Sequence, residues 1–419
     1  MSKRRKGIGQ IVFGLFLAVV FSLGLMKPSI GAMYASVTPT DLIFPVLLVC
    51  WILDITIGSD RFKWRAEFYT FALFFLALLI SVVFSVDPVR SFIKLAGAGY
   101  LIVLAIITAN VVSTIARFRA VVLAWIAGSV ISLAAGLSAF ALFYANPGSD
   151  LLASLTHHYG SVPLLPFPRV SSTFISASMF CNYLTVTLVF ALVAAKLQWI
   201  SRTWITIVIA AIAISAISTF SIALGGFALA IGLWFWATSE NYNARRLSLL
   251  LGILSAVAFL VIAPVSLTSG SGGSFSEPSA RALVWSDATN TFLNDPLTGK
   301  GLGTAVANVI FQNYDGSVSL LTDAHNILLS IAAQSGIGGL LAIIAIAFVI
   351  LKAALIDRVV STEMKIIRVG LVIAFFAAFV YDGMTGAFED ARHLWVLMGL
   401  ILATSSIDDS AESGSLHSA

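Results

Sequence analysis

Charged side chains are scarce in this sequence. Only 11% of its 419 residues are Asp, Glu, Lys or Arg, whereas 59% are hydrophobic and the mean hydropathy is +0.99. Average soluble domains carry roughly 25% charged residues, so this composition excludes a soluble globular protein. It predicts an all-α, polytopic membrane protein with a single membrane domain over residues 1–419.

Cysteine and metal-ligand patterns are also sparse. The two cysteines, Cys50 and Cys181, lie in apolar runs without a metal-type neighbour, and we interpret them as core residues rather than as redox groups. Paired His or carboxylate ligands at helical spacing are missing from the segments predicted to lie outside the membrane. We therefore predict no metal site and no cofactor.

What the sequence has in abundance is long apolar runs. A helix needs about 20 apolar residues to cross a bilayer, and this length predicts about twelve transmembrane helices. The first run follows four basic residues like a secretory signal, but it is as long as a span and lacks a small-residue cleavage site, so we keep it as a helix. The runs are 8–26, 38–57, 66–86, 92–112, 118–145, 173–195, 203–219, 222–238, 247–267, 325–351, 365–385 and 392–405.

The loops give the predicted topology. An even number of spans puts both termini on one side, and the basic residues 3–6 place that side in the cytoplasm. Most of the 24 Lys and Arg residues then fall on the inner side. The least certain boundary is the Ser/Thr-rich break at 219–221, which is also compatible with a kink in one helix.

Two outer loops are long, at 146–172 and 268–324. The second begins with a Gly/Ser tract at 269–276 that is typical of a flexible segment. Farther along, Arg281, Trp285, Ala288 and Phe292 recur at helical spacing and predict an amphipathic helix on the outer leaflet. We expect a large folded loop between the ninth and tenth spans, and a disordered cytoplasmic tail at 406–419.

His325 is the best candidate for a general base. It follows Asp323, a natural N-cap residue, at the start of the tenth span, where the positive end of a helix dipole disfavours imidazolium. The ring is then neutral and can accept a proton. The alternative interpretation is an interfacial histidine that marks the end of a helix.

Arg281 and Arg169 are the candidate anion ligands. A guanidinium presents a rigid fork of donors that suits phosphate oxygens and stays charged when partly desolvated. Two of them on the outer side suit a lipid-linked phosphate or pyrophosphate, although contact with phospholipid headgroups or a salt bridge would explain each one alone. Residues 295–303 lack the spacing of a phosphate-binding P-loop, so their glycines are interpreted as turn formers, and Lys300 adds a cation.

Acidic residues gather around the last outer turn. Asp382, Glu389 and Asp390 lie there beside Arg392, and the predicted role is an ion pair that fixes the last two helices or a contact that orients the base or an arginine. A chain of carboxylates at mid-membrane, which would indicate proton coupling, is not found.

At these residues the sequence resembles the superfamily of bacterial O-antigen ligases and O-antigen polymerases. The resemblance rests on Arg281-Ala-Leu-Val-Trp285, on Asp295-Pro-Leu-Thr-Gly-Lys-Gly-Leu-Gly303, on Ala324-His325-Asn326 with Gly336 following, and on Pro168-Arg169-Val-Ser-Ser-Thr-Phe174. The chain departs from relatives at Thr219-Phe-Ser221-Ile222, where many have a Ser-Arg pair, and at Trp285, where some ligases have leucine. Either the set of arginines at this site is then smaller, or Arg169 carries more of the anion binding.

The resemblance implies a metal-independent, inverting transfer of a glycan from undecaprenyl pyrophosphate to a sugar hydroxyl at the periplasmic face of the inner membrane. His325 would be the general base, with Arg281 and Arg169 on the pyrophosphate. Expected partners are the lipid-linked donor, a lipid A-core or glycan acceptor, and membrane lipids, with no nucleic acid. Further substrate contacts are expected from Lys300, Asn326, Trp285, Asp382 and Arg392.

Three functions compete on the sequence. A ligase that joins O-antigen to lipid A-core is favoured by the spacing from His325 to Gly336. A polymerase would use the same chemistry to extend lipid-linked repeats, because only the acceptor differs. A transporter would also have many spans, but inverted repeats or broken helices with ionisable groups near the midplane are not found.

Overall fold

The computed structural model describes residues 2–32, 35–57, 62–161, 168–266, 280–312, 318–355 and 361–416. Most of these residues are helical, which confirms the all-α prediction. The helices are α1 (Ser2–Ser22), α2 (Pro39–Ile57), α3 (Phe68–Val83), α4 (Pro88–Val111), α5 (Ile115–Ala145), α6 (Asp150–Leu155), α7 (Ala177–Lys196), α8 (Arg202–Ser218), α9 (Leu224–Thr238), α10 (Tyr242–Ser266), α11 (Ala280–Asn294), α12 (Ile327–Leu355), α13 (Thr362–Phe375), the π-helix η1 (Phe376–Tyr381) and α14 (Arg392–Leu416).

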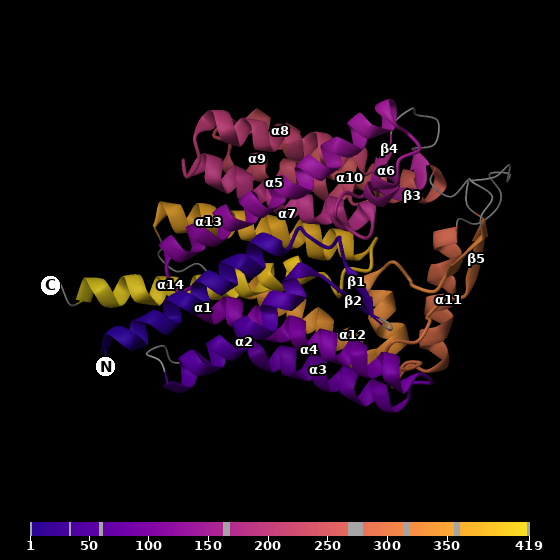
Figure 1. Cartoon of the computed structure of the whole chain (residues 1–419), viewed down its shortest axis with the longest axis horizontal. Helices are drawn as coiled ribbons and strands as arrows, with labels where there is room; N and C mark the ends of the chain where they lie inside the picture. The colour runs from indigo at the N-terminus through magenta and orange to yellow at the C-terminus, as the bar shows by residue number, and fades with distance from the viewer. Residues whose placement is uncertain are drawn as a thin grey trace.

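The described strands form three antiparallel hairpins. They are β1 (Ile30–Ala32) with β2 (Ala35–Val37), β3 (Thr156–Ser161) with β4 (Pro168–Val170), and β5 (Val309–Gln312) with β6 (Val318–Leu321). In the last hairpin Val309 lies opposite Leu321 and Gln312 opposite Val318. The hairpins, α6 and α11 lie at one end of the helical bundle, and α1 begins and α14 ends at the other (Figure 1).

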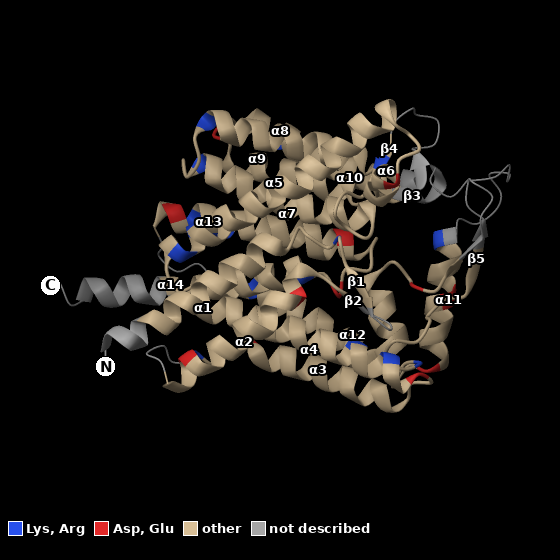
Figure 2. Cartoon of the chain, viewed as in Figure 1, with Lys and Arg blue, Asp and Glu red and all other residues tan. Residues whose placement is uncertain are grey.

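Seven described helices are long and apolar enough to cross a membrane, and five further apolar helices are shorter. A helix occupies each of the twelve apolar runs of the sequence. Charged residues gather toward the two ends of the bundle, with few between them (Figure 2). This distribution is what a bilayer-spanning body requires, and the crossing of the bilayer by all twelve helices stays a prediction.

The centre of the bundle is α7. In its most apolar stretch 83% of the residues are buried, against 11% for α10 and 22% for α2. Helix α7 begins where the side chain of Ser176 accepts a hydrogen bond from the backbone N–H of Met179, as an N-cap does. Since α10 and α2 leave most of their apolar side chains exposed, they lie at the periphery of the bundle, where we expect them to face lipid.

Helices α8 and α9 are two separate helices. The Ser/Thr-rich segment at 219–221 is therefore a break between helices and not a kink within one helix. Helix α8 ends at Ser218, Phe220 has a left-handed φ of 43°, and α9 begins at Leu224. A non-glycine residue rarely adopts this conformation, so the chain turns here instead of bending. Both Thr219 and Ser221 are buried at the turn.

Two predictions about the outer loop and the tail need correction. Helix α11 is present, but Val284 and Ala288 on its apolar face pack against other parts of the loop and against α12 rather than the bilayer. Small residues, Ala324 and Ala333 among them, permit this close approach. Helix α14 continues to Leu416 through most of the predicted disordered tail, because extending a buried helix costs little compared with starting one. The predicted Gly/Ser tract at 269–276 lies outside the described residues.

Candidate functional site

His325 lies in the turn that leads into α12. The N-cap of α12 is Asn326, whose Oδ1 accepts hydrogen bonds from the N–H groups of Leu328 (3.0 Å) and Leu329 (3.1 Å). Asp323 is therefore not the cap: its Oδ1 accepts from the N–H of His325 (3.2 Å) and from Ser330 Oγ (2.8 Å). His325 itself has a φ of 47°. The turn thus places His325 one residue before the N-cap of α12.

The imidazole of His325 is free to accept a proton. Its side chain is exposed, and within the described chain neither ring nitrogen has a hydrogen-bond partner. Surrounding protein still desolvates the ring enough to lower its pKa below the ordinary value; Asp323 acts in the opposite direction, and Arg281 lowers the pKa further. The ring is therefore neutral at neutral pH.

Arg281, in the first turn of α11, has an unsatisfied donor. Its Nη1 is buried and has no hydrogen-bond partner in the part of the chain that the structure describes. Desolvation lowers the pKa of Arg281 to about 10, and the positive charge of Arg169 acts in the same direction. The guanidinium remains charged at neutral pH, and no carboxylate contributes to this shift. A buried cationic donor beside a second cation is a place for an anion.

Arg169 lies on β4 and joins this group from the other side. Its Nε donates a hydrogen bond to the carbonyl oxygen of Thr219 (3.2 Å), at the turn between α8 and α9. Arg169 acts electrostatically on Arg281, and Arg281 acts on His325, so Arg281 lies within electrostatic range of each of the other two. Arg281 thus connects the two other residues that the sequence singled out for chemistry.

Trp285 connects α11 to the histidine turn. Its Nε1 donates a hydrogen bond to the carbonyl oxygen of Ala324 (2.9 Å), one residue before His325. Trp285 lies one helical turn after Arg281, so this bond fixes the arginine relative to the imidazole. The contact is to the protein itself, which favours a positioning role over the substrate contact expected from the sequence.

Residues 295–303, called the glycine turn here, pack against α12 where that helix is interrupted. Gly336 has φ 66° and ψ −165°, which interrupts α12, and a Cβ there would overlap the carbonyl oxygen of Leu297. The N–H of Ile337 instead donates to the carbonyl oxygen of Pro296 (2.8 Å). The glycines are turn formers, as predicted. Lys300 is exposed, and its Nζ donates to the carbonyl oxygen of Ala305 (3.1 Å).

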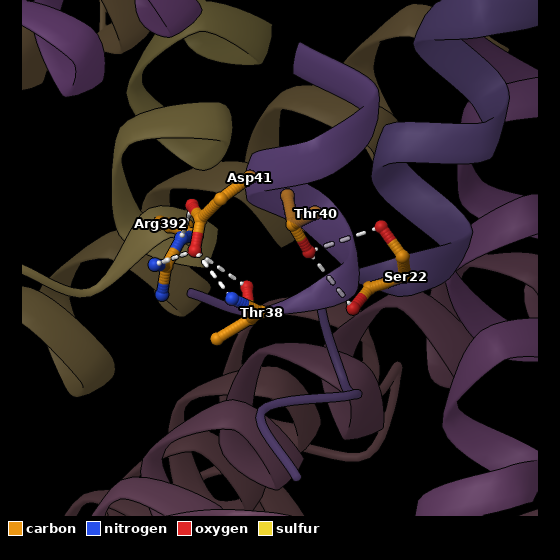
Figure 3. Close-up of polar contacts among 5 residues, drawn as sticks. All are labelled: Ser22, Thr38, Thr40, Asp41 and Arg392. Atoms are coloured by element: carbon orange, nitrogen blue, oxygen red, sulfur yellow. Dashed lines mark hydrogen bonds and ion pairs between the residues drawn. The ribbon is translucent and has the colours of Figure 1, made fainter. Parts of the chain in front are cut away.

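Arg392 forms an ion pair with a residue far away in the sequence. Its Nε donates to Asp41 Oδ1 (2.9 Å) and its Nη2 to Asp41 Oδ2 (2.6 Å), and the N–H and Oγ1 of Thr38 donate to the same carboxylate (Figure 3). Of the two predicted roles of the acidic turn, the ion pair is therefore not made by Arg392, which pairs with Asp41 instead. The pair joins α14 to α2. Two donors of the Arg392 guanidinium are thus bound to Asp41, whereas the sequence analysis expected Arg392 to contact the substrate.

The remaining predicted substrate contacts are also engaged within the protein. Asn326 donates from Nδ2 to the carbonyl oxygen of Met384 (3.1 Å) as well as capping α12. Asp382 is fully buried and accepts at Oδ2 from Nδ2 of Asn182 (2.8 Å). The sequence analysis missed Asn182; its signal was an amide inside an apolar run, which in a membrane helix marks a hydrogen bond between helices.

Within the described residues, no three His, Cys, Asp or Glu side chains are grouped as ligands of a metal ion. The candidate site offers a neutral imidazole and a pair of guanidinium groups to a substrate. This combination suits a proton-accepting base beside an anionic group.

Comparison with known proteins finds a family that matches part of the chain. Residues 207–344 match the family described as O-Antigen ligase, a segment that contains the turn between α8 and α9, Arg281, the glycine turn and His325. Comparison with curated protein sequences finds no match. The family covers O-antigen ligases and polymerases and implies a membrane enzyme of glycosyltransferase type that uses lipid-linked glycans. Residues 207–344 of this chain are thus similar to the O-antigen ligase family.

Proposed function

We propose that the protein is an O-antigen ligase that transfers a glycan from undecaprenyl pyrophosphate to a sugar hydroxyl of lipid A-core at the periplasmic face of the inner membrane. The observation that carries the proposal is the buried Nη1 of Arg281, which has no hydrogen-bond partner among the described residues, beside Arg169 and next to the neutral ring of His325. A pyrophosphate would supply the missing acceptor oxygens. Membrane lipids surround the reaction, and the reaction as written uses no cofactor.

The proposed reaction is a single displacement. The acceptor hydroxyl oxygen attacks the anomeric carbon of the donor, and the bond from that carbon to the pyrophosphate oxygen breaks. The electron pair leaves with undecaprenyl pyrophosphate, whose growing negative charge Arg281 and Arg169 stabilise. His325 takes the proton of the attacking hydroxyl. Displacement from the opposite face inverts the configuration at the anomeric carbon.

The test compares lipopolysaccharide from cells that lack the protein with cells that carry the wild type or His325→Ala. We expect long lipid-linked chains to accumulate beside bare core both in the deletion and in the variant, with the variant expressed normally. Core that carries a single repeat would identify a polymerase instead. Full ligation by His325→Ala would rule out the base.

The competing function is a transporter, and an assay on the purified protein separates the two functions. Uptake of a lipid-linked glycan into vesicles without transfer to an acceptor would favour it. We expect glycan transfer in detergent, where no second compartment exists.

A further inference from the structure

Two interruptions of regular helix face each other inside the bundle. One is the turn between α8 and α9, and the other is the π-helix η1, a rare geometry that is frequent at functional sites. They are in direct contact at the start of α9, where a Cβ on Gly225 would overlap Tyr381 Oη and a Cβ on Gly226 would overlap Asp382 Oδ1. No side chain fits between them, so a movement of η1 is passed to α9.

Asn182 on α7 holds the end of η1. Its Nδ2 donates to the carbonyl oxygen of Ala378 (2.7 Å) and to Asp382 Oδ2 (2.8 Å), and its Oδ1 lies 2.6 Å from Nε2 of His393 on α14. With both amide hydrogens used, Oδ1 is the acceptor and His393 donates from Nε2. Asn182, Asp382 and His393 are all buried. One amide thereby links α7, η1 and α14.

Each side of this link leads to a residue of the candidate site. On one side, the turn before α9 presents the carbonyl oxygen of Thr219 to Nε of Arg169 (3.2 Å). On the other side, Thr385 bonds back to the carbonyl oxygen of Asp382, and the carbonyl oxygen of Met384 accepts from Asn326, the residue that follows His325. The turn before α9 thus leads to Arg169, the turn at 382–385 leads to the residue after His325, and the two turns meet where Gly226 approaches Asp382.

We infer that Asn182, oriented by His393, is a positioning residue that fixes the separation of the Arg169 guanidinium and the His325 imidazole. The effect of these residues on the reaction rate rests on the proposed function, whereas their effect on the geometry does not. Neither Asn182 nor His393 touches the substrate; they act through the turn at 382–385 and the start of α9. A misplacement of about 1 Å at reacting groups can cost about 100-fold in rate, so a contact far from the substrate can matter.

The kinetic test replaces Asn182 with leucine, which has a similar size and no polar atoms. The control is Thr187→Val on the same helix, which removes the bond from Trp125 Nε1 to Thr187 Oγ1 (3.0 Å) between α5 and α7. We expect Asn182→Leu to lower kcat by about tenfold to 100-fold with little change in KM for the donor, and Thr187→Val to keep both. Equal loss in the two variants would overturn the inference.

A second pair of variants separates positioning from packing and does not depend on Asn182→Leu being folded. His393 packs against the edges of Trp125 and Tyr183. His393→Leu fills the space without a donor, whereas His393→Gln can donate to Asn182 Oδ1. We expect kcat to fall with leucine and to be restored at least partly by glutamine. If leucine is the better substitute, His393 only fills space and the inference fails.

A distance measurement tests the geometry without any enzyme assay. Spin labels on Ile175→Cys and Leu320→Cys, both exposed positions, report on the segments that carry Arg169 and His325 in a Cys50→Ser background. We expect Asn182→Leu to broaden or shift the distance distribution and Thr187→Val to leave it unchanged. An unchanged distribution in Asn182→Leu would overturn the inference. If the wild type transfers no glycan, the proposed function fails while this measurement still gives its answer.

Discussion

At the scale of single residues, the proposed reaction depends on two groups with opposite requirements. The imidazole of His325 must be neutral, and the guanidinium of Arg281 must be charged. Desolvation lowers the pKa of both, which brings the histidine into its active form and leaves the arginine, at a pKa of about 10, protonated. Arg281 also helps to keep the nearby ring uncharged.

The pH dependence follows from this arrangement. Transfer needs the neutral ring, so kcat/KM should fall as the pH drops through the pKa of His325, with a midpoint below the ordinary histidine value of about 6.5. Asp323 raises that pKa, so Asp323→Asn should move the midpoint to lower pH while keeping an oxygen for the N–H of His325. Ser330→Ala removes the other bond to Asp323 without changing the charge and should leave the profile in place. A midpoint that rises in Asp323→Asn would contradict this electrostatic account.

The arginine fork makes a separate prediction. Arg281→Lys keeps the positive charge but loses the planar set of donors, so we expect kcat to fall by roughly 100-fold or more, as on loss of one transition-state donor. Arg246→Lys is the matched control, because Arg246 lies over the ring of Tyr242, remote from the site. Purified protein assayed with saturating donor gives both rates. Wild-type turnover by Arg281→Lys would mean that the arginine contacts only lipid headgroups.

At the scale of elements, the sequence predicted where the helices lie but not where they are interrupted. Twelve apolar runs each coincide with a helix, since burial in lipid demands internal hydrogen bonding. The interruption of α12 at Gly336 depends instead on the loop at Leu297, and the π-helix before Asp382 depends on its contacts with α9 and α7. The partner of Arg392 was missed for the same reason: Asp41 is 351 positions away. Local patterns located Arg281, Arg169 and His325, but only the fold connects them to Asn182.

The interruption at Gly336 can be tested directly. Its φ of 66° and ψ of −165° belong to a region that is essentially restricted to glycine, at a cost of about 1 to 3 kcal/mol for other residues. A Cβ would also meet Leu297. Gly336→Ala should therefore lower the Tm clearly. Gly338→Ala, two residues along in regular helix with only Ala77 near, should leave it unchanged or raise it. Equal Tm values would show that the interruption is not required.

At the scale of the whole molecule, the site depends on which side of the membrane the bundle end with α11 faces. Twelve crossings with cytoplasmic termini would place residue 297, in the glycine turn, outside and residue 242, at the start of α10, inside. Both Leu297 and Tyr242 are exposed, so cysteines there can be labelled in a Cys50→Ser background. Leu297→Cys should react with a membrane-impermeant maleimide in intact cells, and Tyr242→Cys only after permeabilisation. If α8 and α9 together made one crossing, the loop at 242 would lie on the outer side and react first. That result would also move Thr219 away from the outer surface, and Arg169 with it, because Arg169 is hydrogen-bonded to Thr219. Arg169 could then not bind a lipid-linked pyrophosphate at the outer surface, as the proposed function requires.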